Sequence, residues 1–104
     1  MEQYAVYENK GGGKAAYPFL LNIQHPLVEG ISPTVMVPLV PLVKLTAFPP
    51  KKLCPLLRVE HQSYVAMTHM LGGVHSCEVG ERVSRLDGEI YDVKNAFDFL
   101  LNGI

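Results

Sequence analysis

Charged residues are scarce in this chain, and positive charge is too thin for a nucleic-acid-binding surface. Asp, Glu, Lys and Arg make up 18% of the 104 residues, and the formal net charge is −1. A protein that binds the DNA backbone needs a dense face of Lys and Arg. The nine basic residues are scattered, and the longest basic run is Lys51-Lys52. We therefore expect any role with DNA to be indirect, through another protein.

Long hydrophobic runs and a secretory signal are also lacking. The longest apolar stretch, residues 35–45, is interrupted by prolines and a lysine and is too short to span a bilayer. Residues 1–4 contain neither a basic segment nor an apolar one of the kind that opens a signal peptide. We expect a cytoplasmic protein with no membrane contact, in which Cys54 and Cys77 are reduced, buried thiols.

Apolar residues are plentiful by contrast, at 48% of the chain. A chain of this length is typical of one domain, here residues 1–104, with a modest core. Because charge is low for a monomer, we expect some apolar surface to remain for a partner.

Alternating apolar and β-branched residues predict several short strands in the first 80 residues. Pro38 falls inside one of them and is expected at an edge or a bulge, since it has no N–H to donate. Gly72-Gly73 is expected to form a turn, and the proline-rich residues 40–55 an irregular excursion without a long helix. The predicted strands are 3–7, 17–24, 34–39 and 74–79, together with a hairpin of 56–59 and 63–67 around 60–62.

The last quarter of the chain has a different period. Apolar residues recur at three- and four-residue steps, which is one face of a helix. We predict a helix over residues 88–101, with Asp87 as its N-cap. The fold class is therefore mainly β, a compact antiparallel sheet followed by one C-terminal helix. The residues of the apolar face are Ile90, Val93, Phe97, Leu100 and Ile104.

No motif places residues for catalysis, a metal or a cofactor. The serines, histidines and acids have no triad or nucleophile-elbow spacing. His69, His75 and Cys77 lack the spacing of a zinc site, so ordinary strand residues are the better interpretation. Residues 11–14 resemble a phosphate loop only superficially, because a strand follows them where that motif requires a helix. We expect no catalytic residue, no metal and no cofactor.

One catalytic alternative stays open, which is RNA cleavage. That reaction needs a general base and a cation beside the scissile phosphate. Five residues could supply parts of such a site, although no spacing in the sequence brings them together: Arg58, Arg82, Arg85, His61 and His69.

The last residues, Asn102-Gly103-Ile104, directly follow the predicted helix. Local physics favours a helix that simply ends in a glycine stop. The same placement also puts a hinge and an apolar tip at one defined point, where a partner could be contacted.

An ordered set of segments resembles the CcdB family. The length agrees, and the likeness runs from about Tyr4 to Ile104. It consists of an early strand (17–24, YPFLLNIQ), a "VIPL"-like segment (35–39, VMVPL), an "MMT/LMT"-like strand (65–68, VAMT) and the closing helix with its Gly-Ile end (93–104, VKNAFDFLLNGI).

This resemblance implies an SH3-like barrel sheet of the CcdB–MazF type, with a small β wing and a C-terminal helix. It implies the toxin of a type II toxin–antitoxin module: a homodimer that binds the DNA gyrase A subunit and traps gyrase on cleaved DNA. It also implies a CcdA-like antitoxin that neutralises the toxin, and a toxin–antitoxin complex that represses its own operon. Modules of this kind serve in plasmid maintenance. The alternatives on this fold are a MazF/Kid-like endoribonuclease and a non-toxic antitoxin-binding protein.

The resemblance also implies a gyrase-binding site. By position, the family's poisoning residues correspond to Asn102, Gly103 and Ile104, with Asp98 one turn earlier and His25 and Leu27 on a loop. The family's best-known members carry Trp immediately before Gly-Ile, where this chain has Asn102. Buried Trp anchors contribute about 2 kcal/mol or more at interfaces. Surfaces for the antitoxin are expected at residues 8–15 and 40–52, which should be exposed.

Overall fold

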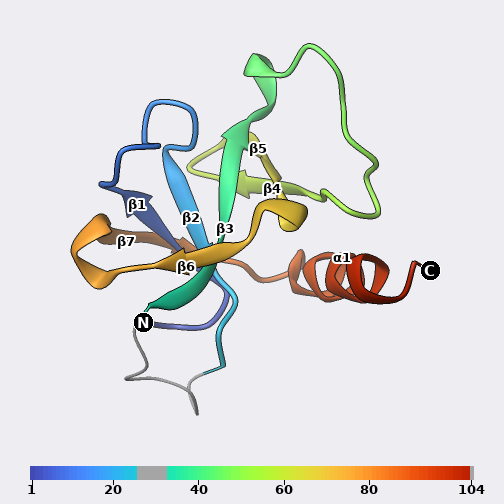
Figure 1. Cartoon of the computed structure of the whole chain (residues 1–104). Helices are drawn as coiled ribbons and strands as arrows, with labels where there is room; N and C mark the ends of the chain where they lie inside the picture. Colours follow the sequence, from blue (N-terminus) through green and yellow to red (C-terminus); the bar gives the residue numbers. More distant parts are fainter. Residues whose placement is uncertain (26–32, 104) are drawn as a thin grey trace.

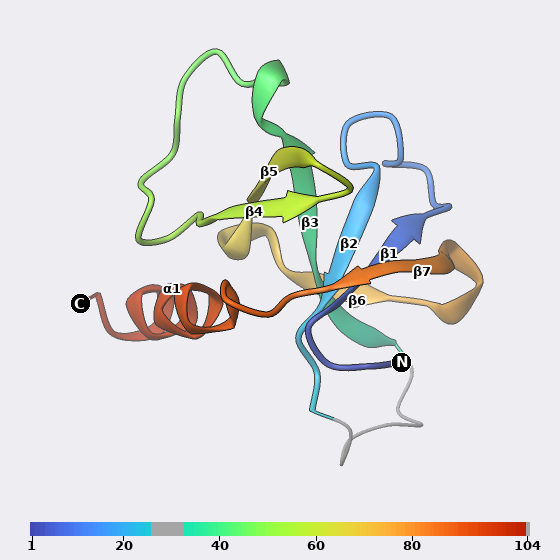
Figure 2. The same cartoon turned by 180° about the vertical axis from the view of Figure 1, so that it is seen from behind.

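The computed structural model describes residues 1–25 and 33–103. Within them, seven strands form one curled antiparallel half-barrel sheet, and a single α-helix projects from its side (Figures 1 and 2). The mainly β prediction is confirmed. The strands are β1 (Ala5–Asn9), β2 (Phe19–Asn22), β3 (Thr34–Pro41), β4 (Leu56–Val59), β5 (Gln62–Ala66), β6 (Gly72–Val74) and β7 (Val79–Arg85). The helix is α1 (Ile90–Asn102), and the 3-10 turns are η2 (Leu42–Lys44), η3 (Thr68–Met70) and η4 (Ser76–Glu78).

The strand order is β4-β5-β3-β2-β1-β7, and β6 pairs with β3 off this path. Pro38 lies in the central strand β3, opposite Leu20 of β2 in a regular register, so the prediction of an edge or a bulge is wrong. On the other side of β3, residues 34–36 pair with β6 and residues 39–41 with β5. The Pro38 carbonyl accepts the Met67 N–H on that side. In an antiparallel strand, the N–H and C=O of one residue point to the same edge. The N–H that Pro38 lacks would therefore face the gap between β6 and β5, where no ladder hydrogen bond is lost.

The hairpin of β4 and β5 is confirmed, with a tighter turn than the sequence indicated. Val59 pairs with Gln62, so only Glu60 and His61 form the turn. Both have positive φ, at 49° and 68°. Two such residues are the signature of the turn that matches the twist of a hairpin. The turn therefore sets the register of the outermost strand pair.

The sheet buries apolar side chains on both faces, because neighbouring residues of a strand point to opposite sides. Val6 of β1 packs on one face with Leu21, Val37 and the buried Leu57 and Val59 of β4, beneath the first turns of α1. Its neighbours Ala5 and Tyr7 pack on the other face. A third cluster lies under the excursion that follows β3, and consists of Val40, Cys54 and Val65.

The helix forms over residues 90–102, where 88–101 was predicted, and buries the first part of the apolar face that the sequence indicated. Leu100, also assigned to that face, is exposed, and Ile104 lies outside the described residues. Val93 and Ala96 are buried, and Ile90 and Phe97 pack against the core. The predicted N-cap is wrong: α1 begins at Ile90 behind Glu89, and no side chain caps it. Asp87 contributes instead through its carbonyl, which accepts the Ile90 N–H at 3.3 Å.

Residues 72–85 depart most from the sequence prediction. Gly72 and Gly73 begin strand β6, where a turn was predicted, because they pair with Met36 and Val35 of β3. Within the predicted strand 74–79, Val74 ends β6 and Val79 begins β7, but residues 76–78 between them form η4. Cys77 in that turn is exposed, not buried. No local pattern indicated β7, in which only the charged residues Glu81, Arg82 and Arg85 are exposed and the others are half-buried.

The excursion over residues 40–55 is irregular, as predicted, apart from the end of β3 and the turn η2. It ends in a tight turn in which the Cys54 N–H donates to the Pro50 carbonyl at 2.8 Å. Across the described residues, no helix is long and apolar enough to span a membrane.

Candidate functional site at the end of the C-terminal helix

Helix α1 ends in a defined way at Gly103. The residue adopts a left-handed conformation, with φ 75° and ψ 15°, and its N–H donates to the Phe99 carbonyl at 2.8 Å. Glycine is favoured there because a Cβ disfavours positive φ. The local glycine-stop interpretation is therefore correct. It also fixes the direction in which the chain leaves the helix.

The predicted site residues on α1 share one face. Asp98 and Asn102 are four residues apart, which places them one above the other on a helix, and both are exposed. Leu101 beside them is 77% exposed. Ile104 and Leu27, which the sequence also assigned to the site, lie outside the described residues. The described end of the helix thus offers an amide, a carboxylate and an apolar side chain to solvent.

A groove of about 580 Å³ runs beside this face, between α1 and the end of the excursion. Its helix wall carries two carboxylates, and its other wall carries two ammonium groups. None of the salt bridges among the described residues joins the two walls, so these charges are available to a partner. The groove is lined by Asp92, Asn95, Asp98 and Phe99 from the helix and by Lys51, Lys52, Pro55 and Leu56 from the excursion.

Sequence reasoning missed the contribution of Lys51 and Lys52. They were the longest basic run in the chain, but two residues are too few to indicate a site by themselves. They line the groove only because the end of the excursion lies beside α1. No local pattern in the sequence indicates that arrangement.

His25 is exposed and directly precedes the residues that are not described. Its segment, residues 23–25, leaves the bottom of the sheet, whereas α1 projects sideways and ends far from it (Figures 1 and 2). Within one chain, the structure therefore does not bring this segment to the helix end.

Large apolar side chains are exposed on the helix, on the excursion and at η3. Tyr91 is 72% exposed at the start of α1, and Phe48 is 69% exposed on the excursion. Met70 and Leu71 are exposed in and after η3, which contacts α1. Apolar surface of this kind marks a protein–protein contact when it is contiguous, and it agrees with the low charge of the chain.

The residues considered for metal binding do not assemble. Among the described residues, no group of three or more His, Cys, Asp or Glu side chains could hold a metal ion. His69 lies instead beside Cys54, with 3.5 Å between Nδ1 and Sγ. Burial raises the pKa of the Cys54 thiol, and a hydrogen bond with the Thr68 backbone lowers it by less. A thiol with a raised pKa is a poor nucleophile or metal ligand at neutral pH.

Two of the five residues considered for RNA cleavage do come together. Arg82 and Arg85 of β7 both bind the Glu2 carboxylate. Arg58 lies on β4 and His61 in the β4–β5 turn, and His69 contacts Cys54. The two histidines, which were the candidates for the general base, thus lie apart from the arginine pair.

The chain thus forms a small half-barrel sheet with one C-terminal helix, and the described end of that helix is exposed to solvent. Comparison with known families identifies the class of protein to which this architecture belongs here. Residues 3–103 match the family model described as "CcdB protein". The chain therefore belongs to the CcdB family, which supports the role of a toxin in a toxin–antitoxin system. No curated protein matches the sequence.

Proposed function

We propose that this protein is a gyrase poison that acts by protein–protein contact, as the toxin of a type II toxin–antitoxin module. It binds the A subunit of DNA gyrase and stabilises the complex of gyrase with cleaved DNA. The family match over residues 3–103 carries this proposal. The low net charge supports it, because such a toxin reaches DNA only through gyrase. No cofactor and no catalytic residue of its own takes part.

The contact surface in this proposal is the end of α1. Asp98 and Asn102 present polar groups, and the final residue, Ile104, follows the glycine turn at Gly103. We propose that a peptide-like tip after the helix inserts at the partner surface. The groove beside Asp98 adds charges of both signs at the rim of the contact.

The proposed assembly is a homodimer. Large apolar side chains on α1 and η3 are exposed in the single chain, and a second copy would cover apolar surface that a monomer leaves in water. A dimer also offers a way to combine His25 and Leu27 of one copy with the helix end of the other.

The partner that neutralises the toxin is proposed to be a CcdA-like antitoxin. The exposed residues of the loop 8–15 and of the excursion 40–52 remain the candidate surface. The joint complex would repress its own operon, with the antitoxin supplying the DNA contact.

A truncation tests the proposal most simply. A chain that lacks Gly103 and Ile104 should lose gyrase-dependent toxicity and retain its fold, since the described core ends at Ala96. Growth arrest on expression and circular dichroism of the purified protein measure the two properties. Full toxicity of the truncated chain would exclude the helix end as the contact.

Two substitutions refine the same test. Asn102→Trp should strengthen gyrase binding by roughly thirtyfold, because a buried Trp anchor contributes about 2 kcal/mol and ~1.4 kcal/mol changes affinity tenfold. Asp98→Asn should weaken binding, whereas the matched control Asp87→Asn, exposed before the helix, should not.

The endoribonuclease alternative rests on one observation, the convergence of Arg82 and Arg85 on a carboxylate. Two cations and a carboxylate are parts of such a site. The alternative predicts that the pure protein cleaves a varied RNA pool without gyrase, and intact RNA after prolonged incubation excludes it.

A further inference from the structure

Strand β7 contains an irregularity that brings two arginines to one face of the sheet. Arg82 and Arg85 are three residues apart, so a regular strand would point them to opposite faces. In the register with β1, Arg85 lies opposite Ala5 and Arg82 opposite Tyr7, with one residue more in β7 than in β1 between these pairs. This β-bulge at Val83 places both arginines on the face of Ala5 and Tyr7.

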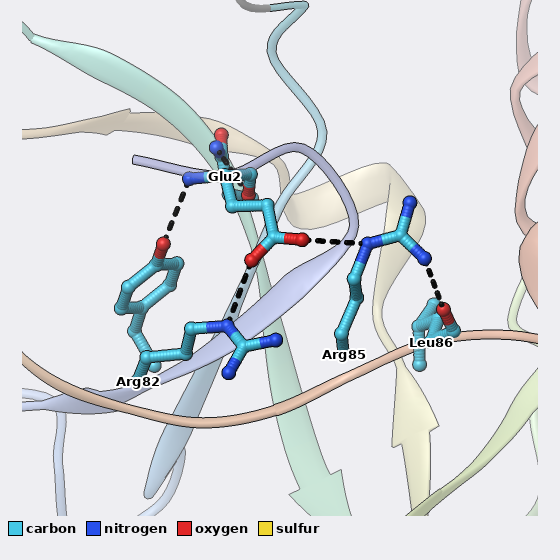
Figure 3. Close-up of polar contacts among 6 residues, drawn as sticks. Glu2, Arg82, Arg85 and Leu86 are labelled. Carbon is cyan, nitrogen blue, oxygen red and sulfur yellow. Dashed lines mark hydrogen bonds and ion pairs between the residues drawn. The ribbon is translucent and has the colours of Figure 1, made fainter.

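The Glu2 carboxylate bridges the two guanidinium groups. One carboxylate oxygen lies 2.8 Å from Arg82 Nε, and the other lies 2.7 Å from Arg85 Nε (Figure 3). Arg85 also donates from Nη1 to the Leu86 carbonyl at 3.3 Å. The remaining terminal nitrogens of both arginines point away from the carboxylate in Figure 3. The arginine side chains are 49% and 45% exposed, so each keeps donors in contact with water.

The position of Glu2 is fixed by its backbone. Its N–H donates to the Tyr7 hydroxyl at 2.8 Å. Its carbonyl accepts a hydrogen bond from the buried Asn22 side chain at 2.9 Å and another from the Ala5 N–H at 3.3 Å. These backbone hydrogen bonds hold residue 2 against the sheet independently of its ion pairs. The Glu2 carboxylate therefore binds Arg82 and Arg85 as an internal ligand would.

Strand β7 is also at the end of the strand order. An edge strand presents N–H and C=O groups to which an extended peptide can add as a further strand. Guanidinium groups bind carboxylates through paired hydrogen bonds. The edge of β7 therefore combines a backbone template with two cations.

The charges around β7 favour a short acidic segment over a nucleic acid. Glu81 directly precedes Arg82, and its N–H donates to Glu8 Oε1 of β1 at 3.2 Å. Glu78 directly precedes the strand. A continuous polyanion would meet these carboxylates, whereas a peptide can carry its acidic residues only beside the arginines.

We infer that Arg82 and Arg85, together with the edge of β7, form a docking site for an extended acidic segment of a partner protein, in which Glu2 holds the place of the partner's carboxylate. The identity of the partner as the antitoxin rests on the proposed function. The site itself does not, and a peptide titration that uses neither gyrase nor antitoxin can test it, so the two proposals fail separately.

Two variants of this one ion-pair cluster should change peptide binding in opposite directions. The probe is a blocked synthetic peptide, Thr-Val-Glu-Val-Glu-Val-Thr, titrated into the isotope-labelled full chain and followed by the amide and arginine Nε–H resonances. Glu2→Gln should tighten binding about three- to fivefold, because it removes a competing carboxylate whose exposed ion pairs amount to at most ~1 kcal/mol. Arg82→Gln/Arg85→Gln should weaken binding about tenfold.

The controls separate docking from a structural role. Arg58→Gln, an exposed arginine on β4, should leave peptide binding unchanged, and the peptide with Gln in place of Glu should not shift the β7 resonances. If the double variant does not fold, Arg82→Lys/Arg85→Lys retains the charges and should bind severalfold more weakly. Absence of β7 shifts, weaker binding by Glu2→Gln, or larger shifts of the same arginines with a short DNA duplex would overturn the inference.

Discussion

Gly103 offers the sharpest test of how the helix end is built. Its φ of 75° lies in the left-handed region, and a Cβ added there would meet nothing within 4 Å. The substitution Gly103→Ala therefore adds no clash, and its whole effect is conformational. An L-residue with a Cβ is disfavoured in this region by roughly 1–2 kcal/mol. We expect Gly103→Ala to lose about 1 kcal/mol of unfolding free energy, because unwinding the last turn limits the loss.

Urea denaturation at one fixed protein concentration measures this loss, since the stability of an oligomer depends on concentration. The midpoint should fall without a change in slope. A thermal scan should show a decrease of about 4–8 °C per kcal/mol. Amide exchange at residue 103 should accelerate, because its bond to the Phe99 carbonyl breaks when the turn unwinds.

A matched glycine provides the control. Gly88 lies before α1, has no positive φ, and has equally open space where a Cβ would be added. Gly88→Ala should therefore be neutral or stabilising by up to ~1 kcal/mol. Gly103→Asn should lose less than Gly103→Ala, because Asn tolerates the left-handed region. Equal stability of Gly103→Ala and the unmodified protein, or equal losses for both alanine variants, would refute the reasoning.

Three further predictions concern the hairpin and the buried titratable groups. Glu60→Asn/His61→Gly should stabilise the protein by about 0.5–1 kcal/mol in thermal scans, because both residues have positive φ. Iodoacetamide should alkylate Cys77, which is exposed, in the folded protein, and buried Cys54 only after unfolding, as mass spectrometry can show. Burial raises the pKa of Cys54 and of Tyr64 above their ordinary values of 9.0 and 10.0. The unfolded chain therefore loses these protons at lower pH than the folded protein does. The free energy of unfolding should consequently fall as pH rises above about 9. Cys54→Ala should make the urea denaturation midpoint depend less steeply on pH.

The elements that could be predicted from the sequence are those whose patterns are local. The period of Ile90, Val93 and Phe97 identified α1, and the alternation around Glu60 and His61 identified the hairpin, because in both cases neighbouring residues already contain the signal. Helix α1 and its glycine end also carry the predicted site residues Asp98, Asn102 and Gly103.

The elements that could not be predicted depend on distant partners. Gly72 and Gly73 are strand residues only because β3 supplies the pairing. The bulge at Val83 breaks the alternation of β7, so the strand has no clean period-2 pattern. The groove at Lys51 and the arginine pair arise in the same way, from segments that meet only in the fold.

The most direct test of the proposed function is plasmid cleavage by purified gyrase with ATP, with and without this protein, followed by detergent and protease treatment. A gyrase poison should make linear DNA accumulate only when the protein is present and not when the chain lacks Gly103 and Ile104. Absence of linear DNA at high protein concentration would contradict gyrase poisoning, while leaving membership of the CcdB family intact.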